Sequence, residues 1–249
     1  MEFAEVAART EAVPHPHIPS ERGRILYDHV REARPERVLE LGTARGVSAA
    51  YIAAALEANG AGTLTTVDST TFPWVDPTPE EVLGGLGLLH RVELDRTHST
   101  YTWFLKERIE ERSDQAGNCE PLYDLCFVDG GKSWTTDGLA VFLIEKLLRS
   151  GGWLLLDDLD WSFDDVAAKR AHYFTPIPLL SESERREPHI AAVFRLLVMQ
   201  HPSFTDFRIQ DEAWGWARKA PGEPRRLTIE AKRTFRSYLH TGLRRLARG

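Results

Sequence analysis

The sequence predicts an α/β protein built on a doubly wound parallel sheet. Between residues 37 and 156, apolar runs of strand length alternate with longer amphipathic stretches, which is the pattern expected when helices cover both faces of such a sheet. The chain has 249 residues, of which 42% are hydrophobic, so it can bury one sizeable core. Because ligands of open parallel sheets bind outside the carboxyl ends of the strands, function is expected in the loops that follow them.

The predicted strands and helices alternate in a regular order. Strands are expected over residues 37–41, 63–67, 91–94, 123–128 and 153–156. Helices are expected over residues 20–33, 46–59, 80–89, 100–112 and 135–149. Ser20 is predicted to be the N-cap of the first helix, Pro35 prevents that helix from continuing, and Gly60 ends the second.

The last part of the chain is less regular. Residues 190–200 favour a helix, and residues 206–210 and 214–219 are predicted to be two closing strands. Residues 227–246 predict an amphipathic helix. Its apolar stripe consists of Ala231, Phe235, Leu239, Leu243 and Leu246.

Charge divides the chain into an acidic body and a basic tail. The formal net charge is −6 at pH 7, but residues 222–249 hold eight basic and two acidic side chains, so the tail is +6 and the remainder −12. An acidic body argues against an enzyme that grips nucleic-acid phosphates over its whole surface, although a basic tail could still tether one. We expect the tail to pack on the body as a helix or to form a contact in a homodimer.

Cysteine spacing and hydropathy indicate the cellular setting. Cys119 and Cys126 have neither metal-site nor disulfide-framework spacing. No uncharged apolar stretch approaches the roughly 18 residues that a membrane span needs, and the first residues lack the apolar segment of a signal peptide. We therefore expect a cytoplasmic protein that does not associate with membranes.

The stretch LELGTARGVS, residues 39–48, follows the first predicted strand and opens a helix. Gly42 would let the backbone turn sharply, and Gly46 would let the N-terminus of the helix approach a ligand. A dinucleotide-binding fingerprint would need glycine in place of Ala44, and the loop lacks the lysine of a phosphate-binding P-loop. By itself the motif predicts only a tight strand-to-helix connection.

Two acidic residues make a nucleoside site the better interpretation of this loop. Glu40 lies immediately before it, and Asp68 ends the next predicted strand. There the carboxylate of Asp68 could accept hydrogen bonds from both ribose hydroxyls of an adenosine. The alternative is that Asp68 caps a helix or a turn. Agreement between the acid, the strand and the spacing from the glycine loop favours the binding role.

The loop motif E-L-G-T-x-x-G-x-S, residues 40–48, is similar to the cofactor loop of the catechol and caffeoyl-coenzyme A O-methyltransferases and their bacterial relatives. Residues 26–159 accordingly resemble the class I S-adenosylmethionine-dependent methyltransferases. The resemblance implies a Rossmann-like, seven-stranded sheet that ends in an antiparallel hairpin, with S-adenosylmethionine as cofactor. On this basis the expected cofactor-binding residues are Glu40, Gly42, Thr43, Ala44, Gly46, Ser48, Asp68 and Asp129.

The resemblance also implies an activity and a division of the chain. The expected reaction is methyl transfer to a hydroxyl of a small molecule. Two alternatives stay open: an RNA methyltransferase tethered by the basic tail, and a module that binds S-adenosylmethionine without catalysis. The expected parts are a lead and helix covering the substrate at 1–35, the S-adenosylmethionine-binding domain at 36–221 and a basic C-terminal helix at 222–249.

Three aspartates follow two neighbouring predicted strands. Asp129 comes after residues 123–128, and Asp157 and Asp158 come after residues 153–156. Neighbouring parallel strands lie roughly 4.8 Å apart, so these carboxylates would repel one another unless a cation lay between them. Oxygen donors without histidine or thiolate favour Mg²⁺, Mn²⁺ or Ca²⁺ over zinc. The resemblance implies magnesium ligands at the same three positions, with Asp158 replacing the usual asparagine, so Mg²⁺ is the expected ion.

Lys132 lies three residues after Asp129, in the stretch DGGKSW. The resemblance implies a general base at this spacing, a lysine in the catechol group and a histidine in sugar and macrolide O-methyltransferases. A nearby divalent cation would disfavour the ammonium form, so Lys132 could take a proton from a polarised hydroxyl. The alternative is a solvated lysine before a helix, which the positive end of the helix dipole disfavours. We therefore predict that Lys132 is catalytic.

Five other side chains are weaker candidates, four of them for contacts with the substrate and Trp74 for a contact with the adenine or methionine part of the cofactor. A tryptophan is more often part of a core than of a binding site, and a histidine in a proline-rich lead carries little information. These candidates are His15, His17, Trp74, Trp134 and Trp161.

Overall fold

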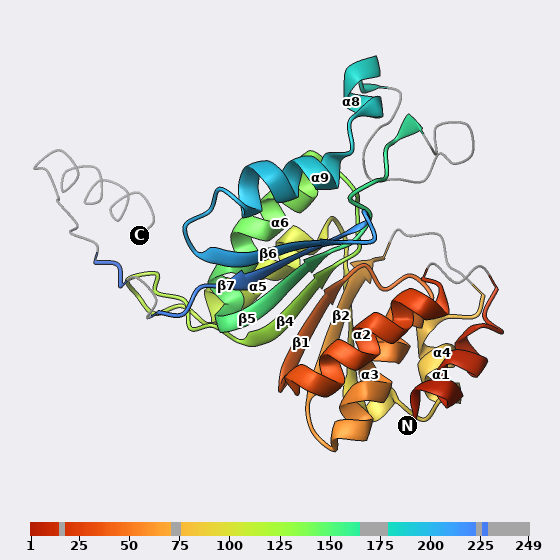
Figure 1. The fold of residues 1–249 in the computed structure, drawn as a ribbon. Helices are drawn as coiled ribbons and strands as arrows, with labels where there is room; N and C mark the ends of the chain where they lie inside the picture. Colours follow the sequence, from red (N-terminus) through yellow and green to blue (C-terminus); the bar gives the residue numbers. More distant parts are fainter. Residues whose placement is uncertain (15–17, 71–75, 165–178, 223–225, 229–249) are drawn as a thin grey trace, which may run out of the picture.

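The structure, a computed structural model, describes residues 1–14, 18–70, 76–164, 179–222 and 226–228 (Figure 1). The strands are β1 (Arg37–Leu41), β2 (Thr63–Ser69), β3 (Val92–Thr97), β4 (Tyr123–Val128), β5 (Leu148–Leu156), β6 (Phe204–Gln210) and β7 (Trp214–Lys219). The helices are α1 (Phe3–Thr10), α2 (Ser20–Ala33), α3 (Val47–Asn59), α4 (Pro79–Gly85), α5 (Tyr101–Glu111), α6 (Trp134–Leu147), α8 (Glu182–Arg186) and α9 (His189–Val193), with short turns η1 (Leu89–Arg91) and η3 (Phe194–Val198).

All seven strands form one sheet in the order β3-β2-β1-β4-β5-β7-β6. The strands from β1 to β5 pair in parallel, and β7 pairs antiparallel with both β5 and β6. The predicted fold class and its terminal antiparallel hairpin are therefore confirmed. The strand order reverses between β1 and β4, which is where ligands bind in open parallel sheets.

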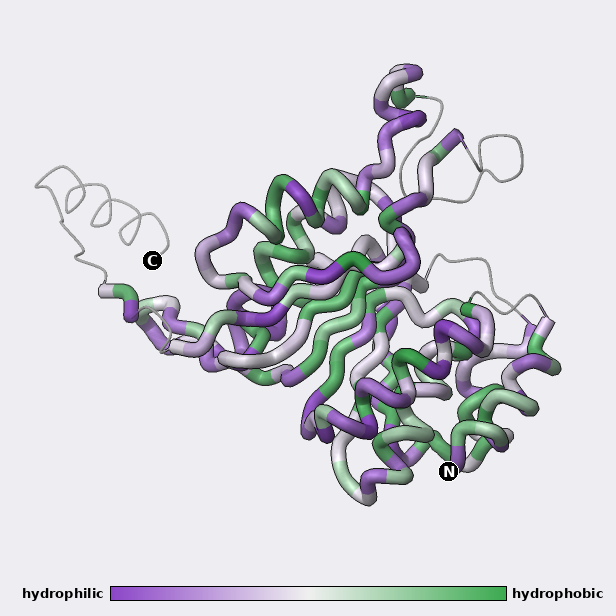
Figure 2. The backbone as a smooth tube through the Cα atoms, viewed as in Figure 1, coloured by the Kyte–Doolittle hydropathy of each residue, from purple (hydrophilic) through white to green (hydrophobic). Residues whose placement is uncertain are grey.

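Helices cover both faces of the sheet (Figure 1). α1, α2, α3 and α4 pack on one face, and α5, α6 and α9 pack on the other. Within β4, Leu125 and Phe127 belong to the first core, whereas Cys126 and Val128 belong to the second, as the alternation of side chains along a strand requires. In Figure 2 the central strands are the most continuously hydrophobic part of the chain. This burial on both faces makes the sheet a rigid base for the loops at its edge.

Several predicted boundaries agree with the structure. The helix over residues 20–33 and the strands over residues 37–41, 123–128 and 214–219 begin and end as expected. Ser20 is not the N-cap, however. Pro19 takes that position in an extended conformation, with φ −71° and ψ 158°, because its ring already holds the backbone where an N-cap needs it.

Two predicted elements have different lengths. α4 is shorter than expected. A capping box of Thr78 and Glu81 marks its start. It ends early because the glycine-rich stretch that includes Gly87, with φ of 72°, does not favour a helix. β5 is longer, since it begins at Leu148. Its glycines, expected to precede the strand, are part of it: a Cβ on Gly152 would lie 2.9 Å from the carbonyl oxygens of Arg149 and Asp124.

The sequence analysis did not predict α1. A signal was present, since Phe3, Val6, Ala7 and Thr10 recur at helical spacing. Val6, Ala7 and Thr10 are buried, and the ring of Phe3 stacks on that of Tyr51 in α3, with centroids 5.7 Å apart. Residues 190–200 form α9 and a π-turn rather than one regular α-helix. The helix predicted over residues 227–246 lies almost entirely outside the described residues.

Among the described residues, no helix combines the length and the apolar character that crossing a membrane would require.

Replacing Gly23 by alanine should destabilise the protein. In an open helix, Gly→Ala stabilises by about 1 kcal/mol, but a Cβ on Gly23 would lie 2.3 Å from the ring of Tyr51, so α2 and α3 would have to separate. Gly85→Ala is the matched control, because a Cβ there meets nothing within 4 Å. Urea denaturation of both variants measures the effect. Equal stability of G23A and G85A would contradict this packing.

Candidate active site

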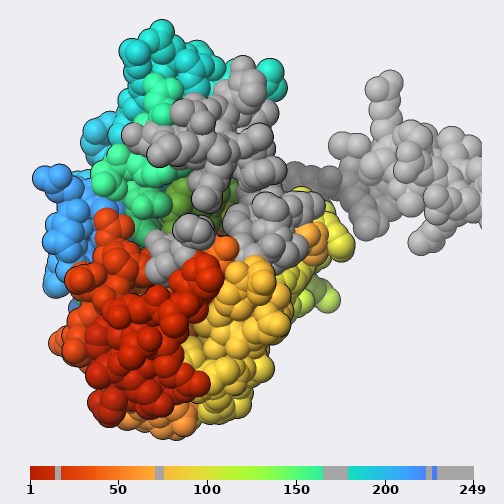
Figure 3. All heavy atoms as spheres, turned by 90° about the vertical axis from the view of Figure 1, so that its right-hand side faces the viewer, coloured from red at the N-terminus to blue at the C-terminus, as the bar shows by residue number. Residues whose placement is uncertain are grey.

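The ends of four parallel strands meet at one edge of the sheet. β1 leads into the glycine loop, residues 42–46; β2 carries Asp68; β4 leads to Asp129; and β5 leads to Asp157 and Asp158. Figure 3 faces the side of the molecule toward which these strands point. On this side the N-terminal helices, in red, lie below, and segments that precede and follow residues 165–178, in green and cyan, lie above.

The glycine loop requires both of its glycines. Gly42 has φ of 105°, and a Cβ on it would lie 2.3 Å from the carbonyl oxygen of Asp129. Gly46 is the N-cap of α3 with φ of 75°, and a Cβ on it would lie 3.0 Å from the Cβ of Pro79. Both positions therefore exclude larger residues by conformation and by space. The loop passes directly beside the end of β4.

Asp68 holds the backbone of this loop. Its Oδ2 accepts hydrogen bonds from the backbone N–H of Thr43 at 3.0 Å and of Ala44 at 2.8 Å. Its Oδ1 accepts from the N–H of Ser69 at 2.7 Å. These contacts are those of a turn cap, the alternative that the sequence left open. A role for Asp68 in binding a ribose stays a prediction.

Glu40 is fully buried beneath the loop and is part of a polar network. Thr66 donates to its Oε2 at 2.6 Å and lies 2.6 Å from the hydroxyl of Thr43. Burial raises the pKa of Glu40 to about 7, while hydrogen bonds from Ser48 and Thr66 act in the opposite direction. No hydrogen-bond partner for its other oxygen, Oε1, lies within the described residues. The end of β1, just before the glycine loop, thus carries a buried carboxyl group with an acceptor oxygen that has no partner among the described residues.

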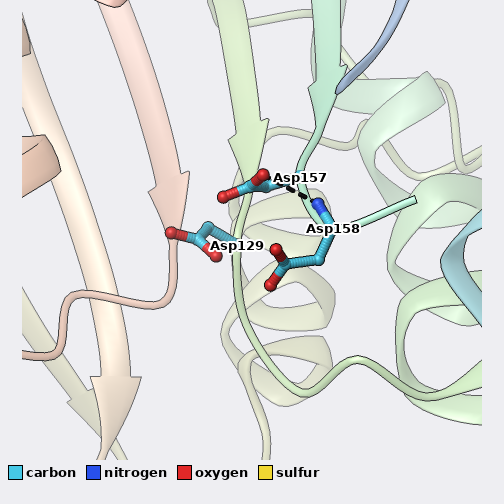
Figure 4. A group of neighbouring side chains, drawn as sticks. All are labelled: Asp129, Asp157 and Asp158. Carbon is cyan, nitrogen blue, oxygen red and sulfur yellow. Dashed lines mark hydrogen bonds between the residues drawn. The ribbon is translucent and has the colours of Figure 1, made fainter. Parts of the chain in front are cut away.

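The three predicted metal ligands come together. Asp129, Asp157 and Asp158 each offer a carboxylate oxygen, and these oxygens lie within 4.8 Å of one another. Figure 4 shows the three side chains gathered where β4 and β5 end. Asp158 has φ of 63°, and its backbone N–H donates to Asp157 at 2.7 Å. Burial and the charges of Asp157 and Asp158 raise the pKa of Asp129, although the charge of Lys132 opposes them.

Lys132 lies inside this acidic cluster. Its ammonium group contacts the carboxylate of Asp129 and lies 2.8 Å from that of Asp158. Burial alone would lower the pKa of Lys132, but the three carboxylates outweigh it and hold that pKa well above its usual range. In the absence of a bound cation, Lys132 is therefore the counter-ion of the cluster. Its predicted role as a base needs the neutral amine and stays a prediction.

Two residues that the sequence analysis missed complete the surroundings of Asp157. The indole N–H of Trp214 in β7 donates to its Oδ1, and Arg22 in α2 lies 3.4 Å from the same oxygen. Burial raises the pKa of Asp157. Because both partners come from distant segments, no local motif could have identified them.

The structure describes two of the five weaker candidates, Trp134 and Trp161. His15, His17 and Trp74 lie outside the described residues. Trp134 is 39% exposed at the start of α6, and the ring of Trp161 packs edge-on against Phe163 with centroids 4.9 Å apart.

A comparison with known families finds a match in the central part of the chain. Residues 39–159 match the family model described as a methyltransferase domain. Residues 39–159 are thus similar to a methyltransferase domain. The matched segment contains the glycine loop, Lys132 and all three clustered aspartates. The resemblance stated from the sequence and the predicted enzyme class, an S-adenosylmethionine-dependent methyltransferase, are thereby confirmed.

Solved structures agree on the fold of this methyltransferase. It is similar to the S-adenosylhomocysteine-bound methyltransferase PaMTH1 from Podospora anserina, with 20% identity, a TM-score of 0.60 and 87% of each chain covered. It is also similar to the O-methyltransferase TomG from Streptomyces achromogenes, solved with S-adenosylmethionine, at 17% identity, TM-score 0.56 and coverage of 88% and 89%. An O-methyltransferase from Bacillus cereus gives 16% identity, TM-score 0.57 and coverage of 87% and 90%. A comparison with curated proteins finds no match.

The buried carboxyl group of Glu40 predicts a pH dependence of the methyltransferase's stability. Its pKa is about 7 in the folded protein against 4.5 for an ordinary glutamate, so the folded state binds this proton more tightly. Stability should therefore fall as pH rises from about 4.5 to about 7, by about 3 kcal/mol from this group. Glu40→Gln should remove that loss.

The test compares urea denaturation of Glu40→Gln and wild type at pH 5 and pH 8. The variant should gain stability relative to wild type at pH 8 and differ little at pH 5. Glu32→Gln is the control, because Glu32 is an exposed residue of α2. An E40Q effect that is the same at both pH values would contradict the ionisation of Glu40 as its cause.

Proposed function

We propose that this methyltransferase transfers the methyl group of S-adenosylmethionine to a hydroxyl oxygen of a small molecule, assisted by a divalent cation. One observation carries the proposal: three carboxylates and a lysine converge within one cluster, directly beside the glycine loop. Two of the similar structures are described as O-methyltransferases. A hydroxyl acceptor must lose its proton, and the lysine of this cluster is the group that we propose takes it.

The residues around the glycine loop fit S-adenosylmethionine. A buried carboxyl group with an acceptor oxygen, Oε1 of Glu40, that has no partner among the described residues suits the positively charged cofactor. Gly42 and Gly46 let the loop pack closely against Asp129 and Pro79, where a Cβ would not fit. We assign cofactor binding to Glu40, Gly42, Thr43, Ala44, Gly46, Ser48, Asp68 and Asp129.

The acidic cluster fits a hard divalent cation. Asp129, Asp157 and Asp158 supply oxygen donors that lie close enough to share one ion. Mg²⁺ is the ion expected for such a set of ligands. Burial and mutual repulsion raise the pKa of Asp129 and Asp157, so a positive charge among them removes an unfavourable interaction. When bound, the cation supplies Lewis-acid polarisation of the acceptor oxygen.

The protein's own part in the reaction is alignment and proton removal. Methyl transfer forms an oxygen–carbon bond and breaks the sulfur–carbon bond, so the acceptor oxygen must lie in line with the sulfonium methyl group. The acceptor's proton goes to Nζ of Lys132. The side chain of Lys132 is 10% exposed at the acidic cluster. This step needs the neutral amine, so it depends on releasing Lys132 from Asp129 and Asp158.

Calorimetry and an acceptor screen test the proposed function. S-adenosylhomocysteine should bind to the purified protein, and Mg²⁺ should increase methyl transfer to phenolic, sugar or polyketide hydroxyls, while a chelator should abolish that increase. Methylation of RNA alone, lost on deletion of residues 222–249, would establish the tethered alternative. Binding without transfer to any acceptor would establish a non-catalytic module.

Removing Asp129 should abolish the metal response. Asp129→Ala deletes one of three oxygen donors, and metal assistance is worth several kcal/mol, so we expect turnover to fall by about 100-fold or more and to become insensitive to Mg²⁺. Asp28→Asn is the control, since Asp28 is an exposed partner of Arg24 in α2. Metal-stimulated turnover by D129A at the wild-type level would eliminate this metal site.

Removing Lys132 should change activity and metal affinity in opposite directions. Lys132→Met deletes the base, which should lower kcat by about 100-fold or more. It also deletes the ammonium group that pairs with Asp129 and Asp158, so Mn²⁺ should bind more tightly by calorimetry. Lys146→Met is the control, because Lys146 lies half exposed at the end of α6. Weaker Mn²⁺ binding by K132M would show that Lys132 supports the ion rather than competing with it.

A further inference from the structure

The loop that carries Lys132, residues 129–133, has an unusual backbone conformation. Lys132 has φ of 54°, in the left-handed region that residues with a Cβ adopt only when their surroundings impose it. The residue is also 8% exposed, so its side chain has little freedom to move independently of the loop. The direction of the lysine side chain is therefore set by whatever holds the two peptides on either side.

Tyr101 holds the peptide before Lys132. This residue is the first of α5, it is 4% exposed, and its hydroxyl oxygen accepts a hydrogen bond from the backbone N–H of Gly131 at 3.0 Å. Its ring also sets the space for the loop, since a Cβ on Gly130 would lie 2.3 Å from the ring. The loop consequently rests on Tyr101 without an intervening side chain.

Asp137 holds the peptide after Lys132. It is fully buried in the first turn of α6, and its Oδ2 accepts a hydrogen bond from the N–H of Ser133 at 2.6 Å. Its other oxygen, Oδ1, accepts from the hydroxyl of Tyr101. The two side chains therefore form one buried unit that binds both N–H groups flanking Lys132.

We infer that Tyr101 and Asp137 are positioning residues for Lys132. Tyr101 begins α5, the helix that follows β3, so the pair ties the Lys132 loop to a neighbouring strand–helix unit as well as to its own helix. Loss of the Tyr101 hydroxyl would remove the hydrogen-bond partner of the Gly131 N–H and of one Asp137 oxygen. One of the two contacts that hold the peptides around Lys132 would then be lost. This inference rests on the proposed role of Lys132 in proton removal.

A double-mutant cycle separates positioning from general stability. Tyr101→Phe should lower kcat by about tenfold or more while leaving KM for the cofactor and the affinity for S-adenosylhomocysteine within about twofold. In the Lys132→Met background the same substitution should have less than about a twofold effect, because residues that act through one group are not additive. An equal loss in both backgrounds would overturn the inference.

Conservative replacement of Asp137 and a matched tyrosine serve as controls. Asp137→Asn keeps an acceptor for Ser133 and should retain more kcat than Asp137→Ala. Tyr51→Phe removes another buried hydroxyl, one that accepts a hydrogen bond from Thr10 at 2.8 Å in the α1–α3 contact, and should leave kcat unchanged. A loss of kcat in Y51F equal to that in Y101F would show that any buried hydroxyl has this effect.

Hydrogen exchange tests the pair without any activity. In Tyr101→Phe, the amide of Gly131 should exchange at least about tenfold faster than in wild type. The amide of Asp129 should change much less, since it bonds to the carbonyl of Leu41 at 2.8 Å. Unchanged exchange at Gly131 would overturn the inference even in an active enzyme. If wild type methylates no acceptor, the proposed function fails, and faster exchange at Gly131 alone would then support the pair as the holder of the loop.

Discussion

The structure of the site depends on the mutual repulsion of carboxylates that the sheet forces together. Val128 in β4 pairs with Leu156 in β5, so the residues that follow must leave the sheet side by side. The N–H of Asp157 donates to the carbonyl of Val128 at 3.0 Å, which extends the pairing by one residue and places Asp157 next to Asp129. Such a cluster is stable only with a positive charge inside it. Lys132 supplies that charge by contacting Asp129 and Asp158. The lysine and the proposed cation therefore interact with the same carboxylates.

The glycine loop and the acidic cluster are coupled through the backbone. Gly42 packs against the carbonyl of Asp129 so closely that no side chain fits between them. The same Asp129 contacts Lys132. A change in the loop that we propose to bind the methyl donor should therefore alter the groups that we propose to act on the acceptor. This arrangement suits a direct transfer, because the donor carbon and the acceptor oxygen must be aligned by a single rigid scaffold.

Local patterns predicted much of this protein, and their limits have a physical cause. The alternation of strands and helices, the glycine loop and the aspartates after β4 and β5 are all visible over short stretches. The partners of Asp157 were not, because Trp214 and Arg22 reach it from segments far away in the chain. The sequence also did not predict that, without a cation, the carboxylates raise the pKa of Lys132. Electrostatic effects of this kind depend on distances that a sequence does not contain.

The sequence by itself determined the fold class, the methyltransferase family and the strand ends that carry the site, because hydrophobic period and glycine placement act over a few residues. The tertiary structure decided how these strand ends are used. It turned Asp68 toward the backbone of the glycine loop and left an oxygen of Glu40 without a partner within the described residues. It also joined Tyr101 to Asp137 across two helices. Such contacts arise only when separate strand–helix units pack. In the buried, low-dielectric interior, small differences in distance then change the energies of ion pairs and hydrogen bonds by large amounts.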